Sequence, residues 1–585
     1  MQSTDVAILG VDVGGTFTDA VLVEEGRIRT AKVPTAARQE ESVVGAARAV
    51  GAGEGVGRFA HGTTVATNAL LERRGARTAY VGNAGFENLL HLRRQTRAHL
   101  YRLCAGHPEP LAPLERCHGV RGRMGPEGEL EPLELDSLPD LGGAEAVAVC
   151  LLFAFRDPSH EQAVAGELRR RHPAVHVVAS HELAPEFREY DRASTTAADA
   201  YLAPVAARYL RALAAAAAEA GLPEPVVMLS SGGVVAAEEA AAHPARLLVS
   251  GPAGGVVGAG LVARRAGFAD AIAFDMGGTS TDVCLLPGGH AARVSEREVG
   301  GLPIRLPSVD VHTVGAGGGS LVRRDAGGAL RVGPESAGAD PGPACYGRGG
   351  GPTVTDANLL LDRLPAELPG GLVLDRDAAA AALDGIDPAA VVEVVNAEML
   401  RALRVVSVER GHDPREFALA AYGGAGPLHA CALAEELGME AVLVPAAAGV
   451  LSALGLAAGE ERRDHVVSHV RPLGEVGDLP PEGEADLRYR GQSFELTVPL
   501  GGDDLAERFH RAHEERYGYA DREREVELVA VRTADVVPGP DLELPSEERQ
   551  RLSGPALLEL DGSTLWIPPG WEGDRDGPSW VVTRE

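Results

Sequence analysis

The sequence Val11-Asp12-Val13-Gly14-Gly15-Thr16-Phe17-Thr18-Asp19 returns almost unchanged in the middle of the chain as Phe274-Asp275-Met276-Gly277-Gly278-Thr279-Ser280-Thr281-Asp282. In both copies an apolar run ends in an Asp, a Gly-Gly pair makes a turn, and hydroxyl residues lead to a second Asp. Solenoid repeats recur every ~20–50 residues, and these two copies lie much farther apart. We therefore predict two lobes of one molecule, each of which presents the same loop to a shared ligand.

The chemistry of this loop suits a nucleotide polyphosphate. Glycine has no Cβ, so a Gly-Gly turn lets backbone N–H groups approach an anion closely. Hydroxyl groups beside the two turns supply further donors, and these belong to Thr16, Thr18, Thr279 and Thr281. Asp12 and Asp275 would face Mg2+ or its waters, because Mg2+ keeps most of its hydration and takes one or two carboxylates plus phosphate oxygens. Two ordinary β-hairpins with glycine turns are the simpler alternative, which accounts less well for two matching copies.

Composition argues against several classes of protein. Lys32 is the only lysine among 55 basic residues, so the chain has no G-x-x-x-x-G-K-[ST] loop of the P-loop NTPases. The net charge of −29 disfavours nucleic acid as a partner, because basic residues drive that binding. Residues 1–7 lack a basic region followed by an apolar core, and no run of about 18 apolar residues occurs. We expect a cytoplasmic protein that binds no nucleic acid and crosses no membrane.

The six cysteines form no CxxC pair, which favours reduced and mostly buried thiols. Cys104 and Cys117, with His107 and His118 nearby, offer zinc-ligand chemistry, but their spacing is looser than that of zinc motifs. Ordinary thiols are the favoured interpretation.

Hydrophobic patterns predict alternating α and β structure. We expect a hairpin at 6–12 and 20–23, buried strands at 77–81, 146–155 and 226–230, helices at 42–50 and 201–220, and short strands near 556–566 and 579–583. Charged, Pro-containing sequence begins near residue 464. We therefore predict three domains, which are 1–195 with the first loop, 196–463 with the second loop, and a small α+β module at 464–585.

Eight segments resemble the hydantoinase A/5-oxoprolinase family. They are residues 10–19, 61–68 (HGTTVATN), 274–283, 310–320 (DVHTVGAGGGS), 333–347 (GPESAGADPGPACYG), 353–358 (TVTDAN), 410–414 (RGHDP) and 423–429 (GGAGPLH). The resemblance extends from residue 5 nearly to the end of the chain, and its motifs are specific.

The resemblance implies an α/β, two-lobed fold of the actin, sugar-kinase and heat-shock-chaperone type, with ATP held between the lobes. Members of the family are subunits of ATP-dependent enzymes that open cyclic amides such as hydantoins or 5-oxoproline, or that carboxylate acetone and related ketones. They usually work with a larger hydantoinase B-type subunit, so we expect an oligomer. ATP and Mg2+, or another divalent metal, are the expected cofactors.

The resemblance also implies which residues hold the nucleotide. Phosphate would contact Gly14, Gly15, Thr16, Gly277, Gly278 and Thr279, and the glycine turn that contains Gly317 and Gly318 would lie at the same site. The turn formed by Gly423, Gly424 and Gly426 would approach the adenosine. The helix that begins near Pro427 would offer its N-terminal amides to an anion. A plain strand-to-helix turn is the alternative for that last motif.

Three further groups are candidates for the acceptor side of the reaction. Asp310 and His312 stand two apart on a β-like stretch and so share one face, where they would support proton transfer, bind a metal or fix the glycine turn. His61 would polarise the substrate amide, unless its neighbouring Thr and Asn residues only cap a helix that begins near Val65. Arg93, with Arg94, Gln95 and Arg97, could meet an acidic substrate or a phosphate.

Two departures from the family pattern bear on specificity. The family has a glycine where this chain has Arg93, and the segments 362–391 and 473–485 are short. We expect the nucleotide site to persist while substrate preference and the partner interface differ.

The predicted reaction is transfer of the γ-phosphoryl group of ATP to the carbonyl of a cyclic amide, which activates the amide for ring opening. Asp12 and Asp275 would hold Mg2+, with Asp310, His312 and His61 near the acceptor. Three alternatives remain, namely a ketone carboxylase subunit, a small-molecule kinase and a non-catalytic actin-like ATPase.

Overall fold

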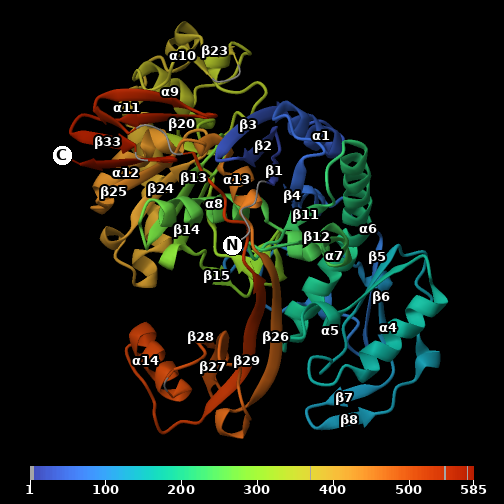
Figure 1. Ribbon diagram of the computed structural model, residues 1–585. Helices are drawn as coiled ribbons and strands as arrows, with labels where there is room; N and C mark the ends of the chain where they lie inside the picture. The colour runs from blue at the N-terminus through green and yellow to red at the C-terminus, as the bar shows by residue number, and fades with distance from the viewer. Residues whose placement is uncertain (1–5, 369–370, 503, 546–548, 576, 585) are drawn as a thin grey trace.

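The computed structural model describes residues 6–368, 371–502, 504–545, 549–575 and 577–584. Two large sheets form two lobes, and helices α8 (Gly251–Arg265) and α13 (Leu451–Ala457) pack against each other between them (Figure 1). The predicted two-lobed α/β class is confirmed. Within the described residues, no helix combines the length and apolar character that crossing a bilayer requires.

The first lobe is built on a ten-stranded sheet with the order β28-β27-β29-β26-β12-β11-β4-β1-β2-β3. Its strands are β1 (Ala7–Val13), β2 (Phe17–Glu24), β3 (Arg27–Pro34), β4 (Val56–Gly62), β11 (Pro225–Met228), β12 (Val234–Ala236), β26 (Glu461–Pro472), β27 (Glu484–Tyr489), β28 (Leu496–Pro499) and β29 (Val526–Val537). The apolar strands β1 and β4 run parallel in the centre, and helix α1 (Gln39–Ala49) packs on β1, β2 and β3.

The second lobe is built on an eight-stranded sheet with the order β19-β14-β13-β24-β25-β34-β33-β30. Its strands are β13 (Ala271–Met276), β14 (Thr281–Leu286), β19 (His312–Val314), β24 (Ala418–Tyr422), β25 (Ala441–Pro445), β30 (Gln550–Ser553), β33 (Trp571–Arg575) and β34 (Ser579–Arg584). Helices α11 (Pro388–Val406) and α12 (Gly426–Leu437) pack on this sheet.

The two lobes repeat one arrangement of strands. In the first lobe β1 pairs antiparallel with β2 and parallel with β4, and in the second lobe β13 pairs antiparallel with β14 and parallel with β24. The duplicated sequence motif is the hairpin turn in both cases. Because the carboxyl ends of β1 and β4 lie at one edge of the sheet, the turn and the residues after β4 share that edge.

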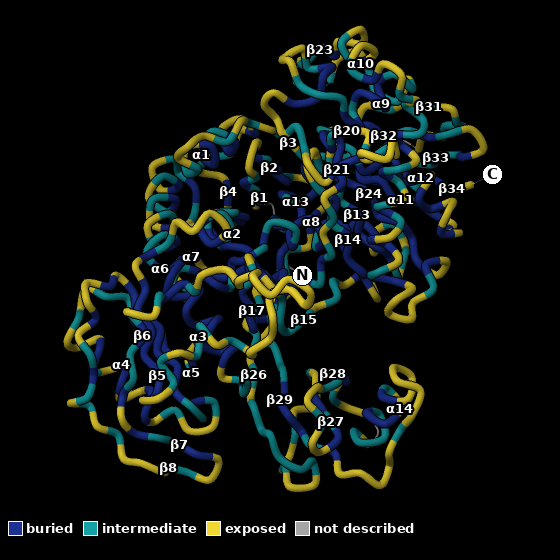
Figure 2. The backbone as a smooth tube through the Cα atoms, turned by 180° about the vertical axis from the view of Figure 1, so that it is seen from behind, coloured by how far each residue is buried: buried dark blue, intermediate teal, exposed yellow. Residues whose placement is uncertain are grey.

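Helices α8 and α13 cross at glycines in the middle of the molecule. A Cβ on Gly455 of α13 would lie 1.8 Å from the carbonyl oxygen of Gly254 of α8. A Cβ on Gly10 of β1 would lie 2.0 Å from the carbonyl oxygen of Ala453. The lobes are therefore joined backbone to backbone, and the buried residues of α8 and α13 belong to one hydrophobic core with strands of both lobes. Buried backbone runs through this crossing (Figure 2).

A third, four-stranded parallel sheet with the order β10-β9-β5-β6 extends the first lobe. It consists of β5 (Thr78–Asn83), β6 (Cys117–Val120), β9 (Ala146–Val149) and β10 (His176–Ala179), with α4 (Ser159–Arg171) against it. The long helix α6 (Glu189–Glu219) contacts this sheet and also helices α1 and α2 (Val65–Leu71).

The remaining elements lie at the periphery or connect these layers. They are the helices α3 (Leu89–Leu92), α5 (Ser180–Leu183), α7 (Ala237–Ala242), α9 (Val354–Leu360), α10 (Arg376–Ala382) and α14 (Leu505–Tyr517), and the strand pairs β7 (Arg123–Gly125) with β8 (Gly128–Glu131), β15 (Arg293–Val294) with β18 (Ser308–Val309), β16 (Arg297–Val299) with β17 (Leu302–Ile304), β20 (Ser320–Arg324) with β21 (Leu330–Ser336), β22 (Glu367–Leu368) with β23 (Leu372–Val373), and β31 (Ala556–Leu560) with β32 (Ser563–Ile567).

Most predicted elements occur, but two boundaries differ. The helix expected at 201–220 begins at Glu189, because buried Ser, Thr and Asp side chains interrupt its apolar pattern while Thr195 and Thr196 donate to carbonyls four residues back. The strand expected at 146–155 ends at Val149. Its extension is stopped because the Leu151 amide donates to the Glu161 carboxylate at 2.7 Å rather than to a neighbouring strand.

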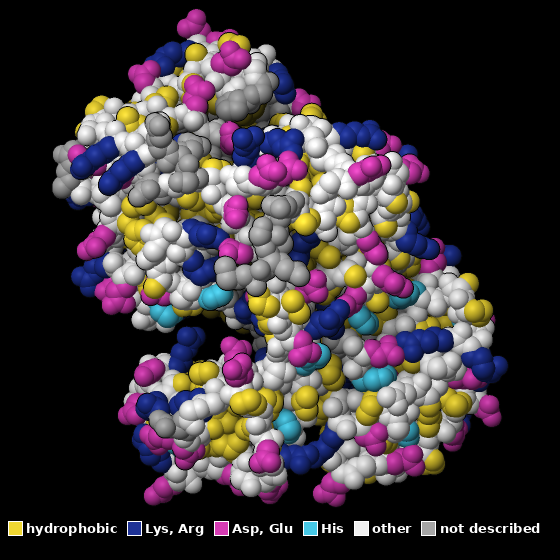
Figure 3. Space-filling model, in the orientation of Figure 1, with side chains coloured by type: hydrophobic (Ala, Val, Ile, Leu, Met, Phe, Trp, Pro, Cys, Tyr) yellow, Lys and Arg dark blue, Asp and Glu magenta, His cyan; other side chains and the backbone are white. Residues whose placement is uncertain are grey.

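The C-terminal part of the chain is divided between the lobes. Strands β26 and β29 form a long ribbon that carries a small tip of β27, β28 and α14 with a core of its own (Figure 1). Residues 550–584 instead complete the second lobe. Figure 3 shows a recess between the tip and the body. The sheets therefore cross the boundaries proposed at 195 and 463, and the division into three domains stays a prediction about folding units.

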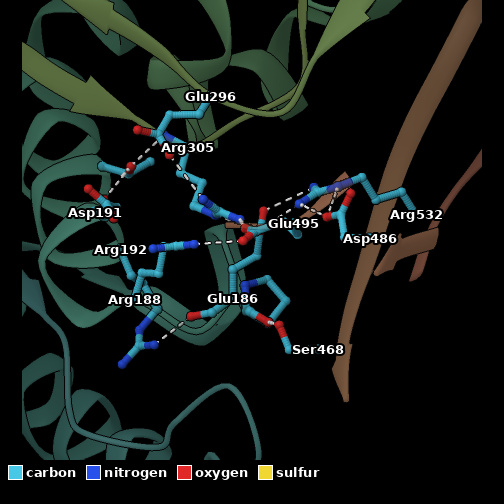
Figure 4. Close-up of polar contacts among 12 residues, drawn as sticks. Glu186, Arg188, Asp191, Arg192, Glu296, Arg305, Ser468, Asp486, Glu495 and Arg532 are labelled. Atoms are coloured by element: carbon cyan, nitrogen blue, oxygen red, sulfur yellow. Dashed lines mark hydrogen bonds and ion pairs between the residues drawn. The ribbon is translucent and has the colours of Figure 1, made fainter. Parts of the chain in front are cut away.

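Buried ion pairs tie the ribbon to the body (Figure 4). Glu186, which is 1% exposed, accepts from Arg305 at 2.7 Å and from Arg532 of β29 at 2.6 Å. Arg532 also pairs with Asp486 of β27 at 2.9 Å. Although burial alone would raise the pKa of Glu186, the charges of Arg532 and Arg305 lower it. The carboxylate is thus ionised and held by two cations from different parts of the chain.

Candidate nucleotide site

The two repeated turns have the same local geometry. The Gly14 amide donates to the Phe17 carbonyl at 2.9 Å, and the Gly277 amide donates to the Ser280 carbonyl at 3.1 Å. Among the described residues, no atom outside the immediate chain neighbours lies within 4 Å of the place where a Cβ would stand on Gly15 or on Gly278. Both glycines and the following threonines are exposed. Open space above bare backbone is the cradle that a phosphate needs.

The four threonines of the motif divide into two kinds. Thr16 and Thr279 are exposed beside their glycines, as a phosphate contact requires. Thr18 is fully buried, and its hydroxyl shares a hydrogen bond of 3.1 Å with Thr35. Thr281 is also fully buried and donates to the Ala316 carbonyl at 2.5 Å. Thr18 and Thr281 thus shape the turns from within, and the contact with a ligand that we expected of them stays a prediction.

Asp12 and Asp275 end their strands in equivalent positions. Asp12 pairs in register with Asp19, and Asp275 with Asp282. Each inner carboxylate lies against a glycine, because a Cβ on Gly62 would lie 2.5 Å from Asp12 Oδ1 and a Cβ on Gly423 would lie 2.2 Å from Asp275 Oδ1. Only glycine leaves room for the carboxylate at these places.

The charges of the two lobes act on each other at this point. Burial and the neighbouring Asp19 raise the pKa of Asp12 to about 7, while Lys32 opposes the shift. Burial, Asp282 and Asp12 raise the pKa of Asp275 to about 8. Neighbouring carboxylates whose negative charges are not neutralised by the protein favour the binding of a cation.

The second turn is supported from behind by the glycine run at 315–319. The Gly318 amide donates to the Gly277 carbonyl at 3.0 Å, and the Gly319 amide to the Gly278 carbonyl at 2.7 Å. A Cβ on Gly317 would lie 2.7 Å from the Gly278 backbone. Gly317 and Gly318 are buried. They position the phosphate turn, so the direct contact with nucleotide that we expected of them stays a prediction.

The turn expected to meet adenosine lies beside the second loop. Gly423, at φ +79°, accepts a hydrogen bond from the Ser563 hydroxyl at 2.8 Å, and the Ala425 amide donates to the Met276 carbonyl at 2.9 Å. Gly424 is exposed and Gly426 begins α12. The turn between β31 and β32 packs on this region, since a Cβ on Gly449 would lie 2.4 Å from Gly562.

These residues fit Mg2+ with ATP better than a metal held by protein alone. Within the described ranges, no three His, Cys, Asp or Glu side chains are grouped to hold a metal ion. Asp12 and Asp275 would hold Mg2+ or its waters, with phosphate oxygens completing the shell. The loose pattern at Cys104, Cys117, His107 and His118 likewise forms no such group in the described part of the chain.

Lys32 belongs to this site, although sequence reasoning used it only to exclude a P-loop. Its ammonium lies 2.6 Å from Asp19 Oδ1, and its charge lowers the pKa of both Asp12 and Asp275 against the effect of burial. One signal in the sequence was available, because Lys32 is the single lysine among 55 basic residues and its ammonium is a more compact charge than a guanidinium.

His61 does not face the two loops. Its ring is fully buried, with Nδ1 3.2 Å from the Val11 carbonyl and Nε2 2.8 Å from the Tyr209 hydroxyl of α6. Burial lowers the pKa of His61 to about 4. A neutral histidine with both nitrogens engaged joins β4 to α6, and its action on a substrate amide stays a prediction.

Asp310 and His312 lie near the start of β19, which pairs with β14 after the second Gly-Gly turn. Asp310 precedes β19 and is held by Arg410, with Arg410 Nη2 3.2 Å from Asp310 Oδ1. His312 pairs in register with Val283, so Thr313 and Val314 lie nearer the turn. Thr313 donates to Asp282 Oδ1 at 2.5 Å. The proposed roles of Asp310 and His312 near the acceptor stay predictions.

The arginines after α3 are engaged in contacts within the protein. Arg93 adopts φ +55°, a value that favours glycine, and donates to the carbonyls of Gly301 and Pro108. Arg94 pairs with Asp191 at 2.6 Å and with Glu296 at 3.0 Å. Both guanidinium groups fasten this segment to its surroundings.

Comparison with known proteins agrees with this geometry. The hydantoinase/oxoprolinase family model matches residues 192–465, and the model of its N-terminal region matches residues 8–172. The chain belongs to the hydantoinase/oxoprolinase family.

Relatives in this family include ATP-dependent enzymes. The chain is 32% identical to the caprolactamase subunit alpha of Pseudomonas jessenii, over 97% of both chains. The crystal structure of the ATP-dependent caprolactamase from that organism superposes with a TM-score of 0.88 at 30% identity, covering 98% of this chain and 99% of the other.

Two other relatives widen the range of chemistry. The chain is 32% identical to 5-oxoprolinase 1 of Arabidopsis thaliana, over 81% of this chain but 44% of that protein. It is 33% identical to the acetophenone carboxylase gamma subunit of Aromatoleum aromaticum, over 75% of this chain and 66% of that subunit. The family thus includes lactam hydrolases and a carboxylase subunit.

Proposed function

We propose that this protein is the ATP-using subunit of an enzyme that opens a cyclic amide. The observation that carries the proposal is the pair of equivalent hairpin turns, one in each lobe, in which Gly15 and Gly278 are open and Asp12 and Asp275 hold matching positions. The charge of Asp12 also raises the pKa of Asp275, across the two lobes. The similarity to an ATP-dependent caprolactamase and to 5-oxoprolinase supports a lactam as the acceptor.

The chemistry follows from the stability of the amide bond. An unactivated amide resists water, so the carbonyl oxygen attacks the γ-phosphorus of ATP, a new P–O bond forms, and the bond to the ADP oxygen breaks. The amide carbon then carries phosphate as a leaving group. Catalysis of this transfer consists mostly of positioning and charge neutralisation. The amides of Gly15 and Gly278 and the hydroxyls of Thr16 and Thr279 would position the phosphates. Asp12 and Asp275 would hold Mg2+, whose charge would neutralise the phosphate oxygens.

A partner subunit completes the proposal. Relatives are named as alpha and gamma subunits, and this chain spans less than half of the Arabidopsis 5-oxoprolinase. We propose that a separate hydantoinase B-type chain takes the place of the remaining half of that longer protein and receives the activated amide.

The test measures phosphate release from ATP with 5-oxoproline, hydantoins, caprolactam and acetone, each with and without a B-type subunit. We expect one lactam to stimulate ATP turnover and to be opened in equal amount. Stimulation by a ketone that requires bicarbonate would replace the proposal with the carboxylase function, and a stable phosphorylated product without ring opening would replace it with a kinase.

The variant Asp275→Asn should reduce lactam-dependent ATP turnover by about 100- to 1,000-fold, because the carboxylate that orients the metal is lost. Circular dichroism should be unchanged. Asp541→Asn is the control, since that carboxylate is 93% exposed and pairs with Arg265 at the surface. Turnover that survives Asp275→Asn would remove Asp275 from the site.

A further inference from the structure

The two phosphate turns are followed by equivalent strand pairs that differ at one position. In the first lobe Asp19 pairs in register with Lys32 of β3. In the second lobe Asp282, the counterpart of Asp19, pairs in register with Thr313 of β19. The two lobes thus place an ammonium and a hydroxyl at matching sites. The only lysine of the chain therefore lies at the position where the strand pairs of the two lobes differ.

The Lys32 side chain reaches toward the first turn. Its ammonium lies 2.6 Å from Asp19 Oδ1 and 5.5 Å from the ring centroid of Phe17, the residue that follows Thr16. The side chain is 35% exposed, whereas that of Asp19 is 18% exposed. The amine is therefore held on one side by a carboxylate and remains accessible from the other.

Lys32 also stands where the lobes meet. Thr30, two residues earlier on the same face of β3, donates to Asp561 Oδ2 at 3.2 Å, and Asp561 belongs to the turn between β31 and β32 of the second lobe. The Cε atom of Lys32 lies 3.5 Å from the place where a Cβ would stand on Gly562 of that turn. The lysine therefore contacts the element that packs beside Gly423 and the second phosphate turn.

We propose that Lys32 binds the terminal phosphates of the nucleotide, leaving Asp19 for the phosphate oxygens when the nucleotide enters. An ammonium is a compact charge with three donors on a flexible stem, which suits an anion that arrives and changes shape during transfer. Lys32 forms no covalent bond in this role. It neutralises charge on the phosphoryl group as that group passes from ADP to the acceptor. This inference rests on the proposed function.

The single lysine makes a direct test possible. An N-hydroxysuccinimide ester of acetic acid modifies only Lys32 and the N-terminal amine, and trypsin does not cut after acetylated lysine. Modification of Lys32 therefore yields an intact peptide from Thr30 to Arg38, which mass spectrometry quantifies. We expect saturating MgATP to slow its formation at least about tenfold, which corresponds to ~1.4 kcal/mol, and adenosine to leave it unchanged. Equal rates with and without ATP would overturn the inference, as would equal protection by adenosine.

Calorimetric titration of variants separates binding from mere neutralisation of Asp19. Lys32→Met should weaken ATP binding at least about tenfold while adenosine binding stays the same, and Lys32→Arg should retain most of the ATP affinity. If Lys32 only neutralised Asp19, the double variant Lys32→Met with Asp19→Asn would recover wild-type ATP affinity, and that recovery would contradict the proposal. Wild-type protein that binds no ATP would overturn both proposals, whereas bound ATP without protection of the amine would overturn only this one.

Discussion

At the residue scale, the two Gly-Gly hairpin turns could be predicted because their signal is local and occurs twice. Asp12, Gly15 and Thr16 carry their geometry within one hairpin, and the second copy repeats it. The partners of Thr18 and Thr281 could not be predicted, because they lie on other segments, at Thr35 and Ala316. The position of Lys32 beside Asp19 could not be predicted for the same reason, because it depends on the pairing of β2 with β3.

His61 gives a prediction about pH at this scale. In the folded protein the pKa of His61 is about 4, below its ordinary value of 6.5. Between these two pH values the ring is therefore protonated in the unfolded chain and neutral in the folded chain. The contribution of His61 to the free energy of unfolding is therefore fully present above pH 6.5. It falls by about 3 kcal/mol as the pH drops toward 4. His61→Gln should remove that part of the pH dependence.

Urea unfolding midpoints of wild type and His61→Gln between pH 4.5 and 7.5 test this expectation. His465→Gln is the control, because the His465 side chain is 51% exposed. An unchanged slope in His61→Gln would mean that the ring is charged or solvated in the folded protein. Lactam-dependent turnover that disappears in His61→Gln at pH 7.5, with the fold intact, would instead favour the acceptor role expected from the sequence.

At the element scale, the apolar patterns predicted the hairpins and the buried strands. They did not predict where helix α6 begins. Its first three turns bury Thr195, Thr196 and Asp199. Both threonines donate to carbonyls of the helix, and Asp199 accepts from the Ala245 amide, which lies far away in the sequence. A rule based on the spacing of apolar residues assigns polar residues in a buried helix to a loop. Their burial depends on partners that are far away in the sequence.

The crossing of α8 and α13 gives a prediction at this scale. Gly455→Ala places a methyl group 1.8 Å from the Gly254 carbonyl oxygen, so one helix must move. We expect a loss of at least about 1–3 kcal/mol of unfolding free energy and a change in the relation of the two lobes. Thermal unfolding together with small-angle X-ray scattering measures both effects.

Gly166→Ala on α4 is the matched control, because no described atom lies within 4 Å of a Cβ at that position beyond the helix's own neighbours. It should stabilise α4 slightly, since alanine favours helix over glycine. If Gly455→Ala were as stable as Gly166→Ala, the close approach of the two helices would not exist in solution.

At the scale of the whole molecule, the family resemblance predicted two lobes correctly, but it did not reveal that the C-terminal part is shared between them. That arrangement depends on the pairing of β26 with β29 and of β34 with β25, which local sequence does not encode. The buried charges around Glu186 likewise connect segments more than 300 residues apart, as the pairing of Glu186 with Arg532 shows.

Glu186→Gln tests what holds the ribbon to the body. Removing the charge leaves Arg305 and Arg532 buried without full compensation, which costs about 3–5 kcal/mol. We expect faster amide hydrogen exchange in β26 and β29 in particular. Glu435→Gln is the control, because its pair with Arg584 is exposed and worth about 0–1 kcal/mol. Equal exchange in the two variants would show that the tip is anchored by its apolar contacts alone.

The sharing of the C-terminal strands has a consequence for biosynthesis. Translation at ~5–20 residues per second takes roughly half a minute to two minutes for a chain of this length, and the sheets take up β29 and β34 only in its last part. Until β26 and β34 have been made, their partners β12 and β25 present unpaired hydrogen-bonding groups that can pair with other nascent chains. Neither lobe can complete its sheet before the C-terminal strands are made. Chaperones that shield the unpaired groups should therefore determine the yield of this protein in cells.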